Sequence, residues 1–188
     1  SLMLILASAS QSRRELLTNA GLAFEIEAPG VDEDEVKLSL TAEKADAMTV
    51  ATTLAELKAR RISEKHPAAF VIGGDSTLAC EGRLFDKPPS VAAAREQLLA
   101  LRGKTHELVS SVVVAKGGGR IWHHTERARL TMRPFSEAFL DAYLKEAGDT
   151  VTTSVGAYRL ESIGAHLLDR KSTRLNSSHV SESRMPSS

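Results

Sequence analysis

The chain has 188 residues, of which 42% are apolar and 26% charged, and its formal net charge is zero. This composition is typical of one globular domain, and the balanced charge gives no overall attraction to nucleic acid or to an anionic membrane. The single cysteine excludes a disulfide framework, and no apolar run approaches the roughly 20 residues of a membrane span. We therefore expect a cytoplasmic protein without nucleic-acid polymers or membranes as partners.

The N-terminal segment predicts a buried strand at residues 3–7, a serine-rich loop and a helix that ends near Gly21. Ser12 and Glu15 have the spacing of a capping box, which predicts that this helix begins at Ser12. Residues 22–30 alternate apolar and polar side chains and end in a Pro-Gly turn, so they predict a second strand.

An acidic loop is predicted at residues 31–39, before a helix at residues 46–65 whose Ala, Leu, Lys and Glu residues have helical spacing. Residues 69–75 are apolar and β-branched at their centre, which predicts a buried strand that closes with two glycines and an aspartate. Residues 76–89 predict a hairpin that turns near Glu81.

The second half of the chain also contains both predicted helices and predicted strands. Ser90 predicts the cap of a helix over residues 91–103, and a glycine turn separates two predicted strands at residues 106–116 and 120–132. Another capped helix is predicted at residues 136–148. Strands and helices in this order indicate an α/β domain with a mixed sheet.

The C-terminal segment has a different composition. We assign residues 1–168 to a single domain, because the apolar periodicity stops at residue 169 and serine fills seven of the last twenty positions. A segment of this kind buries too little apolar surface to offset its ordering entropy. We therefore predict that residues 169–188 are a disordered or non-native tail.

Two arginines raise a question at the start of the first helix. Arg13 and Arg14 stand in the first turn, where the helix dipole disfavours positive charge by roughly 0.3–1 kcal/mol. Free backbone N–H groups there, together with the hydroxyl of Ser8, would suit an anion, and guanidinium groups suit phosphate oxygens. The arginines therefore indicate a phosphate ligand, with solvated or locally paired side chains as the alternative.

Several further residues are candidates for chemistry. Asp75 directly follows the predicted strand, at the position where ligands of open α/β sheets bind, and its carboxylate would suit Mg²⁺; the alternative is a turn or capping aspartate. The acids at residues 32–35 offer a further metal ligand or form a solvated loop. Lys87 lies between a predicted strand and two prolines, and its alternative is an ordinary surface lysine.

Ser76 supports another enzyme class. The stretch GGDST is similar to the G-D-S-L motif of serine esterases, with Ser76 in the place of the nucleophile. Thr77 interrupts that motif, and no D-x-x-H sequence follows near the C-terminus. A serine esterase is therefore an alternative to phosphate chemistry.

Taken together, these segments resemble the Maf family of nucleoside triphosphate pyrophosphatases. The segments LASASQSRRELL, VDEDE, LAELKA, IGGDSTL and FDKP match the family's serine–arginine motif, acidic loop, helix lysine, central aspartate and lysine–proline motif, in that order. LRGKTHELVSSV and SVGAYRLESIGAHLL match later blocks, so the resemblance runs from Leu4 to about Leu168.

The resemblance implies a Maf/ITPase-like fold. This fold has a strongly twisted mixed β-sheet flanked by helices, in two lobes with a central cleft, and often forms a homodimer. The family's closing segment, with its G-L-P-L run, has no counterpart where the serine-rich tail begins. We therefore expect a member that is truncated at its C-terminus.

The resemblance also implies an activity, which is hydrolysis of nucleoside triphosphates to a nucleoside monophosphate and pyrophosphate with a divalent cation (Mg²⁺, Mn²⁺ or Co²⁺). Such an enzyme would remove noncanonical or modified nucleotides. By this resemblance, Asp75 and Glu33 are catalytic acids and metal ligands. Residues that hold the triphosphate are Ser8, Arg13, Arg14, Lys58 and Lys87, the last also counted as catalytic.

Base preference is predicted from Glu161. Members that favour thymidine and uridine triphosphates carry a glutamine in this block, whereas a carboxylate only accepts hydrogen bonds. It therefore suits the N–H donors of guanine or a positively charged 7-methylguanine, and we expect Glu161 to bind such a base. A nucleotide-binding regulator of cell division that does not turn its ligand over is the non-enzymatic alternative.

Overall fold

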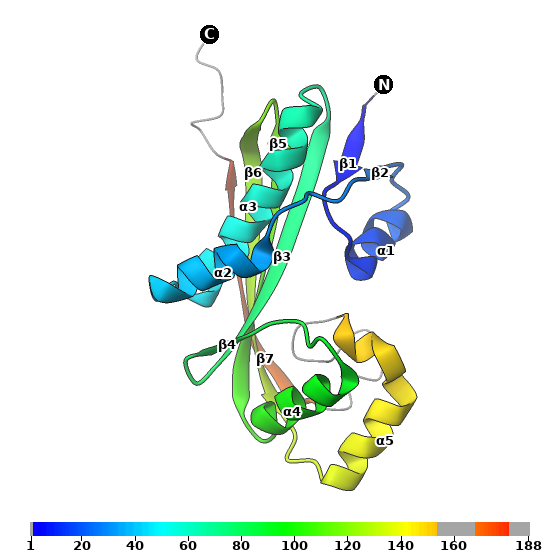
Figure 1. Ribbon diagram of the computed structural model, residues 1–188, viewed down its shortest axis with the longest axis vertical. Coiled ribbons are helices and arrows are strands. Elements are labelled where there is room, and N and C mark those ends of the chain that lie inside the picture. The colour runs from blue at the N-terminus through cyan, green and yellow to red at the C-terminus, as the bar shows by residue number, and fades with distance from the viewer. Residues whose placement is uncertain (1, 154–167, 181–188) are drawn as a thin grey trace. The chain divides into compact units, whose positions relative to one another are not determined.

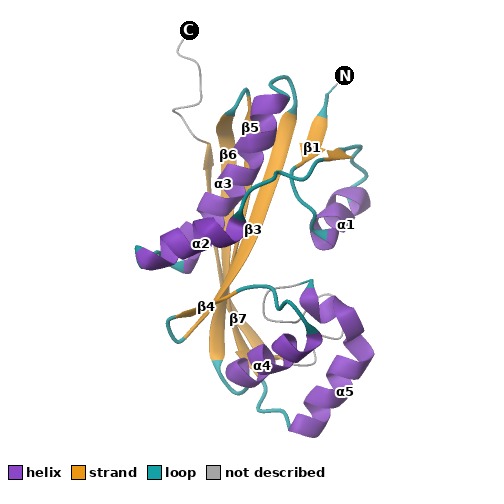
Figure 2. Ribbon diagram, in the orientation of Figure 1, coloured by secondary structure: helices purple, strands orange, loops and turns teal. Residues whose placement is uncertain are grey.

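The computed structural model describes residues 2–153 and 168–180. Its strands are β1 (Leu4–Leu6), β2 (Glu25–Ile26), β3 (Phe70–Cys80), β4 (Arg83–Phe85), β5 (Thr105–Lys116), β6 (Gly119–Met132) and β7 (Leu168–Val180) (Figure 1). Its helices are α1 (Gln11–Asn19), α2 (Glu33–Ala42), α3 (Ala47–Lys65), α4 (Val91–Leu101) and α5 (Glu137–Ala147), the last followed by a 3-10 helix at Gly148–Thr152 (Figure 2).

One mixed sheet joins the strands. Among the described residues it has seven strands in the order β2-β1-β3-β5-β6-β7, with β4 paired to β3 off this path. β1 runs parallel to β2 and β3, with Leu4 opposite Phe70, whereas β4 runs antiparallel to β3, with Leu78 opposite Phe85. This mixed sheet with helices confirms the predicted α/β fold class.

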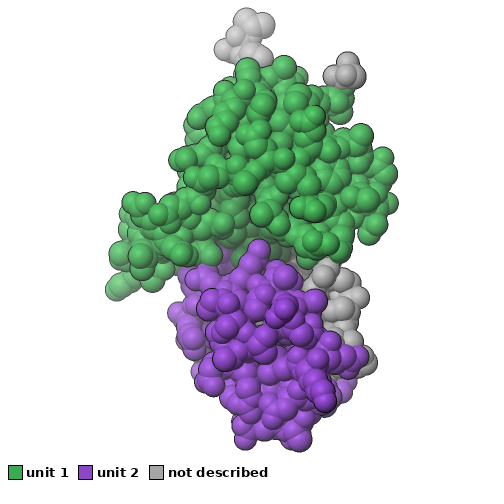
Figure 3. All heavy atoms as spheres, turned by 45° about the vertical axis from the view of Figure 1, so that its right-hand side comes forward, with its two compact units in different colours: residues 1–76, 110–126, 176–188 green, residues 77–109, 127–175 purple. Residues whose placement is uncertain are grey.

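The chain divides into two compact units (Figure 3). The first unit contains residues 1–76, 110–126 and 176–188, and the second contains residues 77–109 and 127–175. This division agrees with the two lobes that the resemblance implies, while the central cleft stays a prediction.

Small side chains form the core of the first unit. In this cluster, α3 supplies Ala55, Ala59 and Ile62, and the neighbouring strands supply residues such as Val71 and Val113. The side chains of α3 at positions i, i+4 and i+7 lie on one face, so an alanine-rich face of the helix packs against the sheet.

Among the described residues, no helix combines the length and the apolar composition that a membrane span needs.

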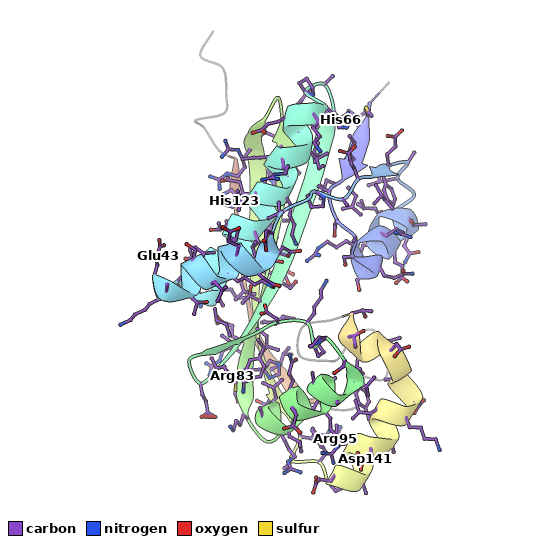
Figure 4. All side chains as sticks on the ribbon, viewed as in Figure 1. Glu43, His66, Arg83, Arg95, His123 and Asp141 are labelled. Atoms are coloured by element: carbon purple, nitrogen blue, oxygen red, sulfur yellow. The ribbon has the colours of Figure 1, made fainter. Side chains whose placement is uncertain are left out.

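Larger apolar side chains form the core of the second unit. The cluster includes Leu98, Leu130 and Leu140, and it draws on α4, α5, β3 and β6. At the surface, Arg95 of α4 joins the two helices, because its Nε lies 3.0 Å from Asp141 Oδ1 and its Nη2 lies 3.0 Å from Glu137 Oε1 (Figure 4).

Helix caps explain most of the helix boundaries. Asp46, Ser90 and Ser136 each accept a hydrogen bond from a backbone N–H in the first turn of α3, α4 and α5, as the sequence predicts for the two serines. The predicted cap of α1 is wrong. Ser10, not Ser12, is the N-cap and accepts from Arg13 N at 3.4 Å, because α1 begins at Gln11.

The predicted acidic loop at residues 31–39 is also wrong, because Glu33–Ala42 forms α2. Asp32 caps this helix by accepting a hydrogen bond from Glu35 N at 3.1 Å. Three acids occupy the first turn, where the helix dipole favours negative charge. The acidic run is therefore a start signal for a helix.

Two strand boundaries differ from the prediction. β3 does not end at Asp75 but continues to Cys80, because its second half pairs with β4. Asp75 accordingly lies within the strand. β2 is limited to Glu25–Ile26, since its register with β1 covers these two residues alone.

The serine-rich segment contains a strand. The structure places β7 at Leu168–Val180, in the last position of the sheet beside β6, where the sequence predicts a disordered or non-native tail from residue 169. A strand at the edge of a sheet gains backbone hydrogen bonds from its neighbour whatever its side chains are, and composition does not register this contribution. Residues 181–188 lie outside the described residues.

Candidate active site

The centre of β3 carries the candidate site. β1 pairs with Phe70–Ile72 and β4 pairs with Leu78–Cys80, so residues 73–77 lie between the two pairings. Side chains alternate between the faces of a strand. The Cβ position of Gly73 faces α3, whereas that of Gly74 faces the side chain of Arg13 from α1. The two faces of β3 therefore present different groups.

On the face toward α3, Lys58 joins two carboxylates. Its Nζ lies 3.2 Å from Asp75 Oδ1, 2.9 Å from Glu33 Oε1 and 3.3 Å from the carbonyl oxygen of Gly74. Asp75 and Lys58 are only 7% and 6% exposed, while Glu33 at the start of α2 is partly exposed. This arrangement brings together three residues that the sequence places on separate elements.

Gly73 explains how Lys58 reaches the strand. A Cβ atom at this position would overlap the carbonyl oxygen of Ala55 and would lie 2.9 Å from Cβ of Ala59. These distances are shorter than real Cβ contacts, so α3 packs on β3 at a separation that only glycine permits. Lys58 lies on the same turn of α3, and its Nζ therefore reaches the backbone and the carboxylate of β3.

Burial determines the protonation chemistry of Asp75. Loss of solvation raises the pKa of this carboxyl, and the positive charges of Lys58, Lys37 and Arg13 oppose the rise. A carboxylate with a raised pKa binds a proton more readily than an exposed one, which suits a general base. Asp75 therefore has the chemistry of a candidate general base.

The opposite face holds Arg13. Its Nη2 lies 3.5 Å from Ser76 Oγ, and a Cβ atom at Gly74 would lie 2.5 Å from its Nε, so the side chain lies directly on the strand. Burial lowers the pKa of the Arg13 guanidinium, while the charges of Asp75 and Glu33 oppose this shift. A guanidinium remains charged in proteins, so Arg13 brings a half-buried positive charge to β3.

The other predicted triphosphate ligands lie in different environments. Ser8 is buried, and its Oγ accepts a hydrogen bond from Ser10 N at 3.0 Å, which fixes the loop before α1. Arg14 is exposed on α1, and Lys87 is exposed in the second unit between β4 and α4. Glu161 lies outside the described residues, so its role stays a prediction.

Sequence reasoning missed Lys37 and Ser110. Lys37 follows Glu33 by one helical turn, which places both on one side of α2, but the predicted loop concealed this periodicity. Ser110 of β5 lies across from β3, with its Oγ 3.0 Å from Ser76 Oγ. Strand pairing alone brings it there, and the sequence holds no local signal for such a contact. The close approaches at Gly73 and Gly74 had a signal, since glycine pairs in strands often mark them.

The carboxylates fit one kind of metal site. The described residues contain no group of three or more His, Cys, Asp or Glu side chains that could hold a metal ion. Mg²⁺, however, is usually bound by one or two carboxylates together with substrate phosphates. Asp75 and Glu33, which contact the same ammonium group, are such a pair. The donor set thus suits a cation that arrives with a nucleotide.

Comparison with known proteins identifies the family. The sequence matches the family described as Maf-like protein over residues 3–177. The nucleoside triphosphate pyrophosphatase of Paramagnetospirillum magneticum is 55% identical over 163 residues, which cover 87% of this chain and 84% of that protein. The protein of the same name from Granulibacter bethesdensis is 54% identical over 167 residues, or 89% and 85% of the two chains. The 7-methyl-GTP pyrophosphatase of Rhizobium meliloti is 42% identical over 168 residues, or 89% and 84%. On these matches, which span most of its length, the chain is a member of the Maf family.

Proposed function

We propose that this chain hydrolyses nucleoside triphosphates to nucleoside monophosphate and pyrophosphate. The observation that carries the proposal is the buried Asp75, which contacts Lys58 on one face of β3 while Arg13 lies against the other. Buried charges are costly unless they are paired, so proteins retain them mainly where they have a function. The names of several relatives agree with this reaction.

The residues of the site divide the chemistry between them. Asp75 accepts a proton from a water molecule, and the oxygen of this water attacks the α-phosphorus. The bond between the α-phosphorus and the oxygen that bridges it to the β-phosphorus breaks. Pyrophosphate leaves with the electron pair of that bond. Arg13 and Lys58 supply positive charge for the phosphate oxygens, and a guanidinium fork matches two of them at once. The unfavourable charge at the start of α1 is thereby offset by the substrate.

A divalent cation completes the proposed site. Asp75 and Glu33 would hold it, and it would neutralise phosphate charge when it is bound. Lys58, which contacts both carboxylates, would supply a positive charge beside the cation.

The serine esterase alternative has little support. Ser76 Oγ contacts Ser110 Oγ and Arg13 Nη2, and neither group is a base that takes up the proton of a nucleophilic serine. The site therefore favours phosphate chemistry over acyl transfer.

The test is product analysis with a panel of nucleoside triphosphates that includes 7-methyl-GTP, with Mg²⁺ or Mn²⁺ and with a chelator. We expect equal amounts of nucleoside monophosphate and pyrophosphate, and no reaction in the chelator. Nucleoside diphosphate and inorganic phosphate as products would contradict the site of attack. A folded protein that binds nucleotide tightly without product would favour the regulator of cell division.

We further propose a guanine-type base, with modified nucleotides such as 7-methyl-GTP among the substrates. The proposal is supported by Glu161, whose carboxylate accepts hydrogen bonds from guanine donors and opposes the acceptor oxygens of uracil. Glu161→Gln should shift turnover from guanine toward uracil nucleotides. An unchanged ratio of kcat/KM values for GTP and UTP would contradict this base preference.

A further inference from the structure

We propose that Ser110 is a positioning residue for the triphosphate and acts through Ser76 on the guanidinium of Arg13. The inference rests on the proposed function, in which Arg13 binds phosphate oxygens. It concerns a hydroxyl pair on β3 and β5, on the face of the sheet opposite Lys58.

The hydroxyl pair is well defined by distance. Ser76 Oγ lies 3.0 Å from Ser110 Oγ and 3.5 Å from Arg13 Nη2. The contact to the guanidinium is at the long end of hydrogen-bond range, and such contacts often tighten when substrate binds. Ser76 therefore has its firmer contact with Ser110.

The donor inventory fixes the direction of one of the two hydrogen bonds. Arginine only donates hydrogen bonds, so Ser76 Oγ accepts from Arg13. The hydrogen bond between Ser76 Oγ and Ser110 Oγ can run in either direction, because each hydroxyl has one proton and two lone pairs. When Ser76 donates to Ser110, the two hydrogen bonds form a chain in which each strengthens the other.

Ser110 matters because the Ser76 hydroxyl has several rotamers. Without its partner on β5, the Ser76 side chain would redistribute among three staggered positions, and only some of these face Arg13. Gly74 leaves space for the arginine on the strand but supplies no side chain to hold it. The serine pair thus holds the Arg13 guanidinium in the space that the absence of a side chain at Gly74 leaves open.

The neighbouring Ser111 provides a matched control. It lies on the same strand but on the other face, where its Oγ contacts Thr125 Oγ1 at 3.2 Å and Thr52 Oγ1 at 3.4 Å. Ser111→Ala removes a hydroxyl from a buried position without contact to Arg13. We expect it to change stability and to leave nucleotide binding unchanged.

The experiment measures the Kd of an α,β-methylene nucleoside triphosphate by calorimetry, alongside KM and kcat. Ser110→Ala should weaken binding and raise KM by about 3- to 10-fold, as expected for the loss of one ordered polar contact, with a smaller change in kcat. Ser110→Thr, which keeps the hydroxyl, should restore the wild-type Kd. In the Arg13→Met background, Ser110→Ala should have no further effect, because the group that it positions is gone.

Three results would overturn the role of Ser110: an unchanged Kd in Ser110→Ala, an equal change in Ser111→Ala, or a full effect in the Arg13→Met background. A wild-type protein that binds the analogue but releases no pyrophosphate from natural nucleotides would overturn the proposed function alone. Absence of analogue binding by the wild-type protein would overturn both.

Discussion

The two compact units of this protein bury different kinds of side chains. Among the described residues, five of the nine members of the first unit's core cluster are alanines. The second unit's cluster has thirteen members in the described part of the chain, and these are mostly leucines and aromatic residues. Each large apolar side chain contributes about 1.5–3 kcal/mol when it is fully buried, whereas alanine contributes less. The average member of the first unit's cluster therefore contributes less than the average member of the second unit's cluster.

The small side chains in the core of the first unit allow a helix and a strand to pack closely. Alanines on α3 and a glycine on β3 let the helix approach the strand closely, which brings Lys58 onto Asp75. In the second unit, α4 and α5 are joined at the surface by an exposed ion-pair network around Arg95. Close packing of small residues thus serves to place buried charges, and packing of large residues serves stability.

Removal of Lys58 should have the largest effect on stability. Lys58→Met leaves Asp75 buried without its ammonium partner, and breaking a buried pair in this way costs about 3–5 kcal/mol. The pKa of Asp75 is already raised by burial and should rise further. Because the folded state then binds a proton more tightly than the unfolded state, the lost stability should be regained as the pH falls through the raised pKa. Urea unfolding at several pH values measures this.

The control for this prediction is Lys145→Met, an exposed lysine of α5 in the second unit. It should change stability by less than about 0.5 kcal/mol at every pH. Equal losses in the two variants would contradict the difference between the units.

The glycine pair of β3 should separate stability from activity. Gly73→Ala forces a Cβ atom onto backbone atoms of α3 and should cost about 3 kcal/mol in unfolding free energy, since backbone cannot move aside cheaply. Gly74→Ala meets the flexible side chain of Arg13, so it should cost less than about 1 kcal/mol but lower kcat/KM roughly tenfold. The reverse order of effects, measured by unfolding and by pyrophosphate release, would contradict the assignment of the two faces.

His106 provides a smaller, pH-dependent test in the second unit. Burial lowers the pKa of this 2% exposed histidine to about 4 from its ordinary value of 6.5. Between these two pKa values, His106 is protonated in the unfolded chain but not in the folded chain. The free energy of unfolding should therefore fall by about 2–3 kcal/mol as the pH drops from 7 to 4. His106→Phe should flatten this part of the stability curve. A slope identical to that of the wild-type protein would show that His106 does not titrate in this range.

Local patterns predicted much of the fold. The serine caps of α4 and α5 were predicted because a cap is a contact between neighbours in sequence. The start of α2 was missed because three consecutive acids are compatible with both a solvated loop and a favourable helix start. The end of β3 was misplaced because the pairing with β4, rather than local composition, extends this strand past Asp75.

The sequence predicted which residues form the candidate site, but it did not predict how they are arranged in space. Arg13 and Asp75 stood out by charge and position, and Glu33 was one of four adjacent acids that offered a metal ligand. Lys58 came from the resemblance alone. Their convergence depends on α3 packing at Gly73, which is a tertiary contact. The sequence did not indicate a role for Ser110, because the role of a serine in a strand depends on the residue that lies opposite on the neighbouring strand.

The most direct test of the catalytic role of Asp75 is the rate of pyrophosphate release by Asp75→Asn, with Asp141→Asn of the second unit as the matched control. Asparagine keeps the shape of the side chain but cannot accept the proton of the attacking water, so we expect a loss of about a thousandfold or more. Circular dichroism should show that the variant is folded, and Asp141→Asn should retain the wild-type rate. A folded Asp75→Asn protein with a rate close to that of the wild type would contradict the assignment of this cluster as the active site.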